Sequence, residues 1–355
     1  MKKKFIRNII LSKTPLATTF RFKNTFQIFP CDFEKAPKSK NNDDIPLIIE
    51  YWIDEEENVQ VSDDLIELED ILGRGTNTAN RINRITRLLT AITNHRFYSY
   101  FPEKKWGTIL PEGEIDDKKR EEINNQSSET FIGRYTYPSI KNDMVINDFS
   151  KQNHPDTELI EHSSYYFYNP LDSKEKQMTF PNTIYDVLEK YFALDSKSRK
   201  IVDTVSHLIC NGIDLRIRMK SMSFLSFVSS IETLVNYEYK DLKDEIKFEC
   251  YDCQTIKSSP IVCPKCGRPI WGVKAKFKNF LQTYASKSES SISKYNRIYN
   301  LRSDIVHNGL LLLGDEQIDW TKSNKVDNQY LTHIETMQLA RFSLVNWLLM
   351  KKQKK

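Results

Sequence analysis

The segment YNRIYNLRSDIVHNG, residues 295–309, carries the pattern that decides the fold of the C-terminal half. Its apolar side chains recur at helical spacing, and on an ideal helix one apolar arc contains Tyr295, Ile298, Leu301, Ile305 and Val306. Asn308-Gly309 is typical of a helix C-terminus, because glycine adopts the left-handed conformation at little cost. The segment therefore predicts a helix that buries one face in a bundle.

The same periodicity extends over the chain from Pro181 onward. It predicts helices near residues 182–194, 198–213, 219–238, 274–286, 290–308 and 330–351. Asp195 is a suitable N-cap for the second of these helices. Residues 181–355 are therefore expected to form an all-α bundle.

The N-terminal region shows strand patterns instead. Half-buried strands are predicted by alternating apolar residues at Phe20/Phe22, Phe26/Ile28 and Leu47/Ile49/Tyr51/Ile53. A further strand is expected at Phe131–Tyr137. A helix is predicted by the helical spacing of Ile82, Ile85, Leu88, Leu89 and Ile92. Residues 141–180 are polar and predict a connection. The fold class is thus α+β, with a mixed α/β domain at 1–140 followed by the bundle.

Composition excludes several classes of protein. The chain has 355 residues, of which 39% are hydrophobic, so it is not mostly disordered. Its 52 Lys+Arg against 48 Asp+Glu exclude a histone-like or ribosomal-type basic protein. No window approaches 18 uncharged apolar residues, so no membrane span is expected. The N-terminus begins like a signal peptide, but Arg7 and Asn8 interrupt it, so a cytoplasmic location is expected.

Residues 74–106 are basic, and their last part is interleaved with aromatic side chains, Phe97, Tyr98, Tyr100, Phe101 and Trp106. Two interpretations stay open. In the first, the stretch is a surface that binds the phosphate backbone of a nucleic acid. In the second, it is the solvated face of a helix, and its positive charges balance the acidic stretch at 54–70.

Four cysteines form two C-x2-C pairs, Cys250/Cys253 and Cys263/Cys266, inside an insertion at residues 247–272. Each pair brings two thiolates to one side of a tight turn, and two pairs complete a tetrahedron. Four thiolates favour one Zn²⁺ per chain, with iron as the alternative. Four protein ligands leave no position for a substrate or water, so the zinc is expected to be structural and no catalytic metal is expected.

Basic residues flank the second cysteine pair, namely Lys265, Arg268, Lys274 and Lys276. They allow an alternative interpretation, in which the ribbon is a nucleic-acid contact surface and the bundle is only its scaffold.

Arg302 falls inside the apolar arc of residues 295–309, where a guanidinium is costly unless an anion meets it. Glu232 has the complementary problem on the apolar side of the helix at 219–238. A Glu232–Arg302 ion pair would compensate both. His307 lies in the last turn, about 140° around an ideal helix from Arg302, so the two could meet across a symmetric dimer.

The strings YNLRSDIVHNG and, before it, FVSSIETLVNYEY resemble the HEPN superfamily of helical domains, most closely the ApeA-like HEPN domains of bacterial anti-phage proteins. The resemblance covers about residues 180–350. The superfamily signature is an arginine followed after four to six residues by a histidine, which maps onto Arg302 and His307. The residue after the arginine is Ser303, where many members carry Asn, Asp or His.

The resemblance implies a metal-independent RNA endonuclease whose active site, with Arg302 and His307 as catalytic residues, forms where two HEPN domains dimerise. It also implies a role in abortive infection, a phage-derived trigger and a sensor or regulatory role for residues 1–140. The alternative is a non-catalytic dimerisation or RNA-binding module with a ligand-sensing N-terminal domain. In a purely structural interpretation, Arg302 only fixes the bundle and His307 offsets the helix dipole.

Overall fold

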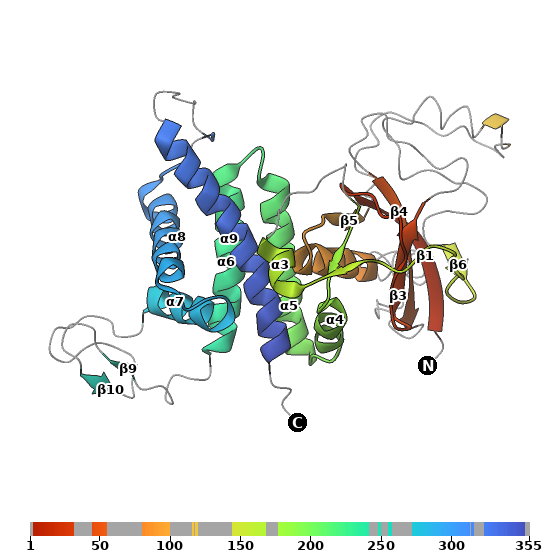
Figure 1. Cartoon of the computed structure of the whole chain (residues 1–355), viewed down its shortest axis with the longest axis horizontal. Coiled ribbons are helices and arrows are strands. Elements are labelled where there is room, and N and C mark those ends of the chain that lie inside the picture. Colours follow the sequence, from red (N-terminus) through yellow and green to blue (C-terminus); the bar gives the residue numbers. More distant parts are fainter. Residues whose placement is uncertain are drawn as a thin grey trace, which may run out of the picture. The chain divides into compact units, whose positions relative to one another are not determined.

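The chain forms two compact units in the computed structural model. The first comprises Met1–Tyr165 and Leu171–Asn182, and the second comprises Tyr166–Pro170 and Thr183–Lys355. The structure describes residues 3–31, 45–54, 80–99, 116, 118–119, 144–167, 177–240, 248–249, 255–257, 272–312, 314–315 and 323–351. The first unit is rich in strands and the second is helical (Figure 1), which confirms the α+β class.

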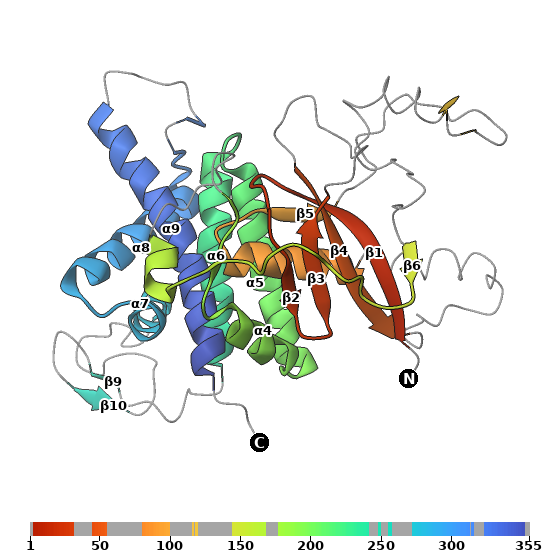
Figure 2. The ribbon, with the colours of Figure 1, turned by 45° about the vertical axis from the view of Figure 1, so that its right-hand side comes forward.

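An antiparallel sheet forms the core of the first unit (Figure 2). Its strands are β1 (Lys3–Ser12), β2 (Phe20–Phe22), β3 (Phe26–Pro30), β4 (Ile45–Asp54), β5 (Phe97–Ser99) and β6 (Met144–Ile146). The order is β2-β3-β4-β1-β5, and β6 also pairs with β1. The strands predicted from the alternation at 20–22, 26–28 and 47–53 are all present, whereas the predicted strand at 131–137 lies outside the described residues.

The longest pairing in this sheet joins β4 to β1, a strand that the sequence did not predict. Ten consecutive residue pairs link the two strands. Two polar residues, Arg7 and Asn8, interrupt the apolar pattern of β1, and both find polar partners on β4. Arg7 lies 2.6 Å from the fully buried Glu50, and Asn8 Nδ2 donates to Tyr51 Oη. Gln27 and Ser150 donate further hydrogen bonds to Glu50, so this buried carboxylate is well satisfied.

A helix over residues 80–92 belongs to the same unit. The apolar side chains that predicted it are all buried, Ile82, Ile85, Leu88, Leu89 and Ile92. Thr90 joins it to β5 by donating to the Phe97 carbonyl oxygen. Phe97 is itself fully buried, so it belongs to the core rather than to an aromatic surface. Residues 74–79 and 100–106 lie outside the described part of the chain.

The segment with polar composition at 141–180 carries short elements in its described parts. They are β6, β7 (Leu159–Ile160), α3 (His162–Phe167) and β8 (Phe180–Pro181), which pairs in parallel with β7. The backbone N–H groups of Phe180 and Asn182 donate to the carbonyl oxygens of Glu158 and Ile160, so the pairing of β7 with β8 satisfies these backbone groups.

Helices build the second unit. They are α4 (Ile184–Phe192), α5 (Ser196–Leu215), α6 (Lys220–Glu238), α7 (Val273–Tyr284), α8 (Glu289–Asn308) and α9 (Ser323–Met350). All six predicted helices are confirmed, and α9 begins seven residues before the predicted start. Helix α6 lies at the centre, since it packs against α5, α7, α8 and α9 (Figure 1).

Two predicted helix termini have the expected capping geometry. The Asp195 carboxylate accepts a hydrogen bond from the Ser198 backbone N–H at 2.9 Å at the start of α5. The Ser198 hydroxyl and amide both hold the pKa of Asp195 below its usual range. At the end of α8, Gly309 adopts a left-handed conformation with φ of 66°. None of the helices in the described ranges is long and apolar enough to cross a membrane.

Candidate active site on helix α8

Arg302 and Glu232 form the ion pair that the sequence predicts. Arg302 on α8 places Nε 3.2 Å from Glu232 Oε1, and its Nη2 donates to Oε2 at 3.5 Å. The side chains are 24% and 16% exposed, so the pair lies at the edge of the bundle rather than deep inside it. A pair in this position keeps one side of the guanidinium within reach of solvent, and therefore of a ligand.

Glu232 depends on the arginine to balance its negative charge. Its Oε1 is buried and accepts no hydrogen bond among the described residues, so its main stabilisation is the charge of the nearby guanidinium. Tyr299 lies close to both charges: burial and the negative charge of Glu232 raise its pKa, and Arg302 opposes them. The Tyr299 ring packs against Phe277 of α7, with centroids 5.5 Å apart. Glu232 of α6 therefore holds the arginine, and α7 packs against the nearby Tyr299.

His307 is exposed in the last turn of α8, five residues after Arg302. The backbone N–H groups of Gly309 and Leu310 both donate to the Asp304 carbonyl oxygen, which ends the helix just after His307. Because five residues correspond to about 140° around an α-helix, the arginine faces α6 while the histidine faces away from it. Within one chain the two side chains point in different directions.

Val306 shows where the predicted apolar arc is wrong. Tyr295, Ile298 and Ile305 are buried as expected, but Val306 is 47% exposed. The arc is narrower than predicted, because Val306 lies at its edge and no described element covers it. An exposed valine beside an exposed histidine gives this end of the helix a partly apolar surface.

Further apolar side chains are exposed near the end of α8. Leu310 and Leu311 are 41% and 42% exposed. The next residue, Leu312, donates its N–H to Ser221 Oγ, which brings the segment to the start of α6, where Met222 is also exposed. Sequence reasoning passed over this surface, although the run of leucines directly after the Asn308-Gly309 stop was a visible signal.

Basic residues on α7 lie beside α8. Lys274 is exposed, and its Nζ donates to Asn300 Oδ1 at 2.8 Å. Lys276 is half-buried on the same helix, whereas Lys265 and Arg268 lie outside the described residues. Lys274 thus adds positive charge to the helix that carries Arg302.

The predicted zinc ligands Cys250, Cys253, Cys263 and Cys266 lie outside the described residues. Two short strands flank the first cysteine pair, β9 (Phe248–Glu249) and β10 (Ile256–Lys257), and they pair in antiparallel fashion. In the part of the chain that the structure describes, no three His, Cys, Asp or Glu side chains are grouped to hold a metal.

Comparison of the chain with protein-family models, with curated proteins and with solved structures found no match. A function therefore has to be argued from the residues and geometry of this chain.

Proposed function

We propose that the protein is a metal-independent endoribonuclease of the HEPN type that acts in abortive infection against phage. The observation that carries this proposal is the fixed position of Arg302. Glu232 of α6 holds this arginine, and α8, which carries the arginine, also presents the exposed His307 five residues later. This combines the Arg-x4-His motif with a geometry in which the cation is oriented and the imidazole is open to a substrate.

The chemistry needs no metal because RNA supplies its own nucleophile. The imidazole of His307 removes the proton of a ribose 2′-OH, and the oxygen attacks the adjacent phosphorus. The bond from phosphorus to the 5′ oxygen breaks, and a second imidazole protonates this leaving group. The products are a 2′,3′-cyclic phosphate and a 5′-OH.

Arg302 is suited to the phosphate. Glu232 engages Nε and Nη2, and none of the described contacts engages Nη1. The planar guanidinium can therefore direct its remaining N–H groups at a phosphate oxygen, where charge builds up in the transition state. The ion pair orients the arginine before the substrate arrives, which lowers the entropic cost of binding.

A homodimer through the C-terminal bundle supplies the second imidazole. The exposed Val306, Leu310 and Leu311 surround His307 with apolar surface, which is favourable to bury between two copies. In a two-fold arrangement of this end of α8, the two His307 side chains divide the roles of base and acid, and each lies near the partner's arginine.

The remaining parts complete the proposal. The four cysteines hold a structural Zn²⁺ that stabilises the inserted ribbon, and the N-terminal unit acts as the sensor or regulatory part that responds to a phage-derived trigger. The protein would act in the cytoplasm on RNA.

The test uses the full-length purified protein and a labelled RNA. His307→Ala is expected to abolish cleavage while RNA binding and the melting temperature stay unchanged, because the side chain is exposed. His207→Ala, which changes an exposed histidine on α5, is the matched control and should cleave as the wild type does. Cleavage retained by His307→Ala would refute the proposal. RNA binding without cleavage in the wild type would instead favour the non-catalytic binding module.

A further inference from the structure

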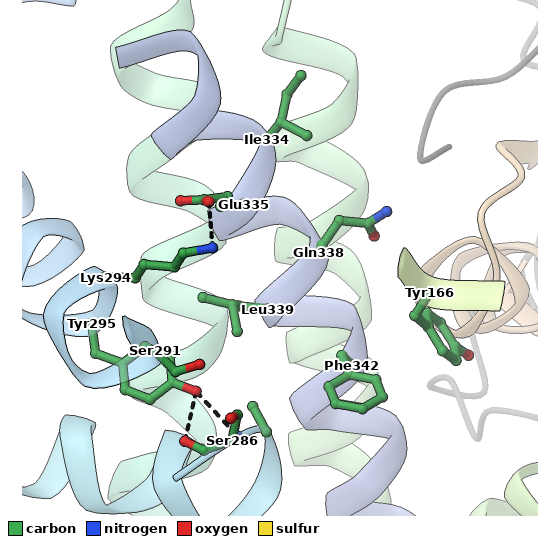
Figure 3. Close-up of a pocket in the computed structure, with 11 residues that line it drawn as sticks. Tyr166, Ser286, Ser291, Lys294, Tyr295, Ile334, Glu335, Gln338, Leu339 and Phe342 are labelled. Atoms are coloured by element: carbon green, nitrogen blue, oxygen red, sulfur yellow. Dashed lines mark hydrogen bonds and ion pairs between the residues drawn. The ribbon is translucent and has the colours of Figure 1, made fainter. Parts of the chain in front are cut away.

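The second unit contains a cavity of about 500 Å³ that the proposed reaction does not use (Figure 3). Helix α9 supplies one wall, and the end of α7, the start of α8 and Tyr166 supply the others. The volume lies within the range of sites that bind small molecules. The cavity is distinct from the candidate active site, because neither Arg302 nor His307 is among its lining residues.

Most of the lining is apolar and rigid. The rings of Tyr166 and Phe342 lie with centroids 5.7 Å apart. Tyr295 is fixed from both sides of its hydroxyl, which donates to the Ser286 carbonyl oxygen and accepts from the Ser286 N–H. Tyr166 and Tyr295 are each 1% exposed and make this wall rigid, whereas the half-buried Phe342 ring leaves a surface that a planar ring can contact.

Gln338 is the unusual residue of this cavity. Its side chain extends from α9 among the lining residues (Figure 3). Both Oε1 and Nε2 are buried, and neither has a hydrogen-bond partner in the described part of the chain. A buried amide that lacks both partners costs free energy, and most buried amides are satisfied. The unsatisfied pair therefore points to a ligand that presents a donor beside an acceptor.

The charges at the cavity favour an anionic group on that ligand. Glu335 lines the cavity and accepts contacts from Lys294 at 2.8 Å and from Arg297 at 2.7 Å. Arg297 is not among the lining residues, but its contact neutralises Glu335 and leaves the Lys294 ammonium as the unbalanced charge at the cavity. Lys294 is 45% exposed, so it can turn toward a phosphate without leaving a buried charge behind.

We propose that this cavity binds an adenine nucleotide. The amide of Gln338 matches the N6 amino group and the N7 acceptor of adenine, a bidentate pairing that glutamine makes with this base. The half-buried Phe342 ring contacts a face of the base, and the Lys294 ammonium accepts the phosphate because Arg297 neutralises Glu335. This inference stands on the cavity and does not depend on the nuclease chemistry of Arg302 and His307.

The nucleotide can come from two sources that share this chemistry, a free mononucleotide or an adenosine within a single strand of RNA. Calorimetric titration of the full chain with adenosine monophosphate and with a 2′-O-methyl tetra-adenylate separates them. The methyl group removes the 2′-OH nucleophile, so binding is measured without cleavage, and failure here is distinguishable from failure of the nuclease proposal.

The decisive comparison couples one change in the protein to one change in the ligand. Gln338→Leu should weaken binding about tenfold, because a bidentate pair is lost, whereas Gln329→Leu on the same helix should bind as the wild type does. Purine riboside monophosphate, which lacks the amino group, should bind the wild type more weakly than adenosine monophosphate. The Gln338→Leu variant should bind purine riboside monophosphate and adenosine monophosphate with equal affinity.

The ligand-free protein gives a second measurement. Gln338→Leu should melt at a higher temperature than the wild type, because it removes two unsatisfied buried groups while keeping a similar volume. Leu339→Trp, which fills the cavity, should abolish binding by a route that does not touch the amide. Absence of binding of both adenine ligands at about 1 mM would overturn the proposal, as would unchanged affinity in Gln338→Leu or a lower melting temperature of that variant.

Discussion

Arg302 has an observed role in the bundle and a proposed role in chemistry. Its ion pair with Glu232 compensates a carboxylate oxygen that is otherwise buried without a hydrogen bond, and the same contact orients the guanidinium. The two roles separate in substitutions, because charge alone supports the bundle while planar geometry is needed at a phosphate.

Arg302→Ala is expected to destabilise the protein by about 1–2 kcal/mol, since it leaves Glu232 half-buried without a counter-charge. Arg302→Lys should fold with nearly the wild-type free energy of unfolding and yet lose phosphate handling. Chemical denaturation followed by circular dichroism measures the difference.

The double variant Arg302→Ala/Glu232→Gln is the control for this prediction. Removing the uncompensated carboxylate should restore most of the lost stability. If the double variant is as unstable as Arg302→Ala, the loss comes from packing of the arginine stem rather than from the stranded charge.

At the scale of elements, α6 and α9 are joined by a buried histidine. His333 Nε2 lies 2.7 Å from Ser223 Oγ, and the Ser223 hydroxyl donates to the Gly212 carbonyl oxygen. Since the serine hydrogen is used by Gly212, the imidazole must donate through Nε2, which assigns the tautomer. The contact links α5, α6 and α9 by one chain of hydrogen bonds.

Burial lowers the pKa of His333 to about 4, and the charges of Arg216 and Lys220 add to this effect while Asp315 opposes it. The unfolded chain binds a proton near pH 6.5 and the folded chain does not, so stability falls as the pH is lowered from about 6.5 to about 4. The free energy of unfolding lost through the protonation of His333 is on the order of 3 kcal/mol. Denaturation measured across this pH range should show a shallower decline in His333→Gln.

The comparison with His333→Gln isolates the histidine from other groups that titrate in the same range. Glutamine keeps a donor for Ser223 but has no charge change. An equal decline in both proteins would mean that His333 does not contribute to the pH dependence.

At the scale of the whole molecule, the proposed nuclease and the proposed zinc site make different demands on metal. Cleavage through Arg302 and His307 needs no divalent cation, so EDTA should leave the rate unchanged in short assays. The closed four-cysteine site would release zinc slowly, and metal analysis should find one zinc per chain. Cleavage that stops at once with EDTA and returns with Mg²⁺ would contradict the assignment.

Activity should also follow dimerisation, because one chain provides only one Arg302/His307 pair. Val306→Asp places a charge on the exposed surface beside His307 and should disrupt the dimer and the cleavage together. Light scattering at micromolar concentration and a cleavage assay measure both. A wild-type monomer with full RNase activity would contradict this prediction.

Local patterns were sufficient to predict the helices of the second unit. Their apolar spacing, the Asp195 cap and the Asn308-Gly309 stop depend on residues a few positions apart, so the order of the chain contains them. The Glu232–Arg302 pair could also be predicted, because each charge stands on an apolar face of its own helix and needs an opposite partner.

Strand β1, the exposure of Val306 and the unsatisfied amide of Gln338 could not be read in this way. Arg7 breaks the alternation of β1 and is compensated by Glu50, 43 residues further along the chain. The exposure of Val306 and the cavity around Gln338 depend on which helices pack together and where they leave space. Periodicity along one element thus determined the helices and their termini, while partners, exposure and cavities were decided only by tertiary packing, since they depend on distances between residues far apart in sequence.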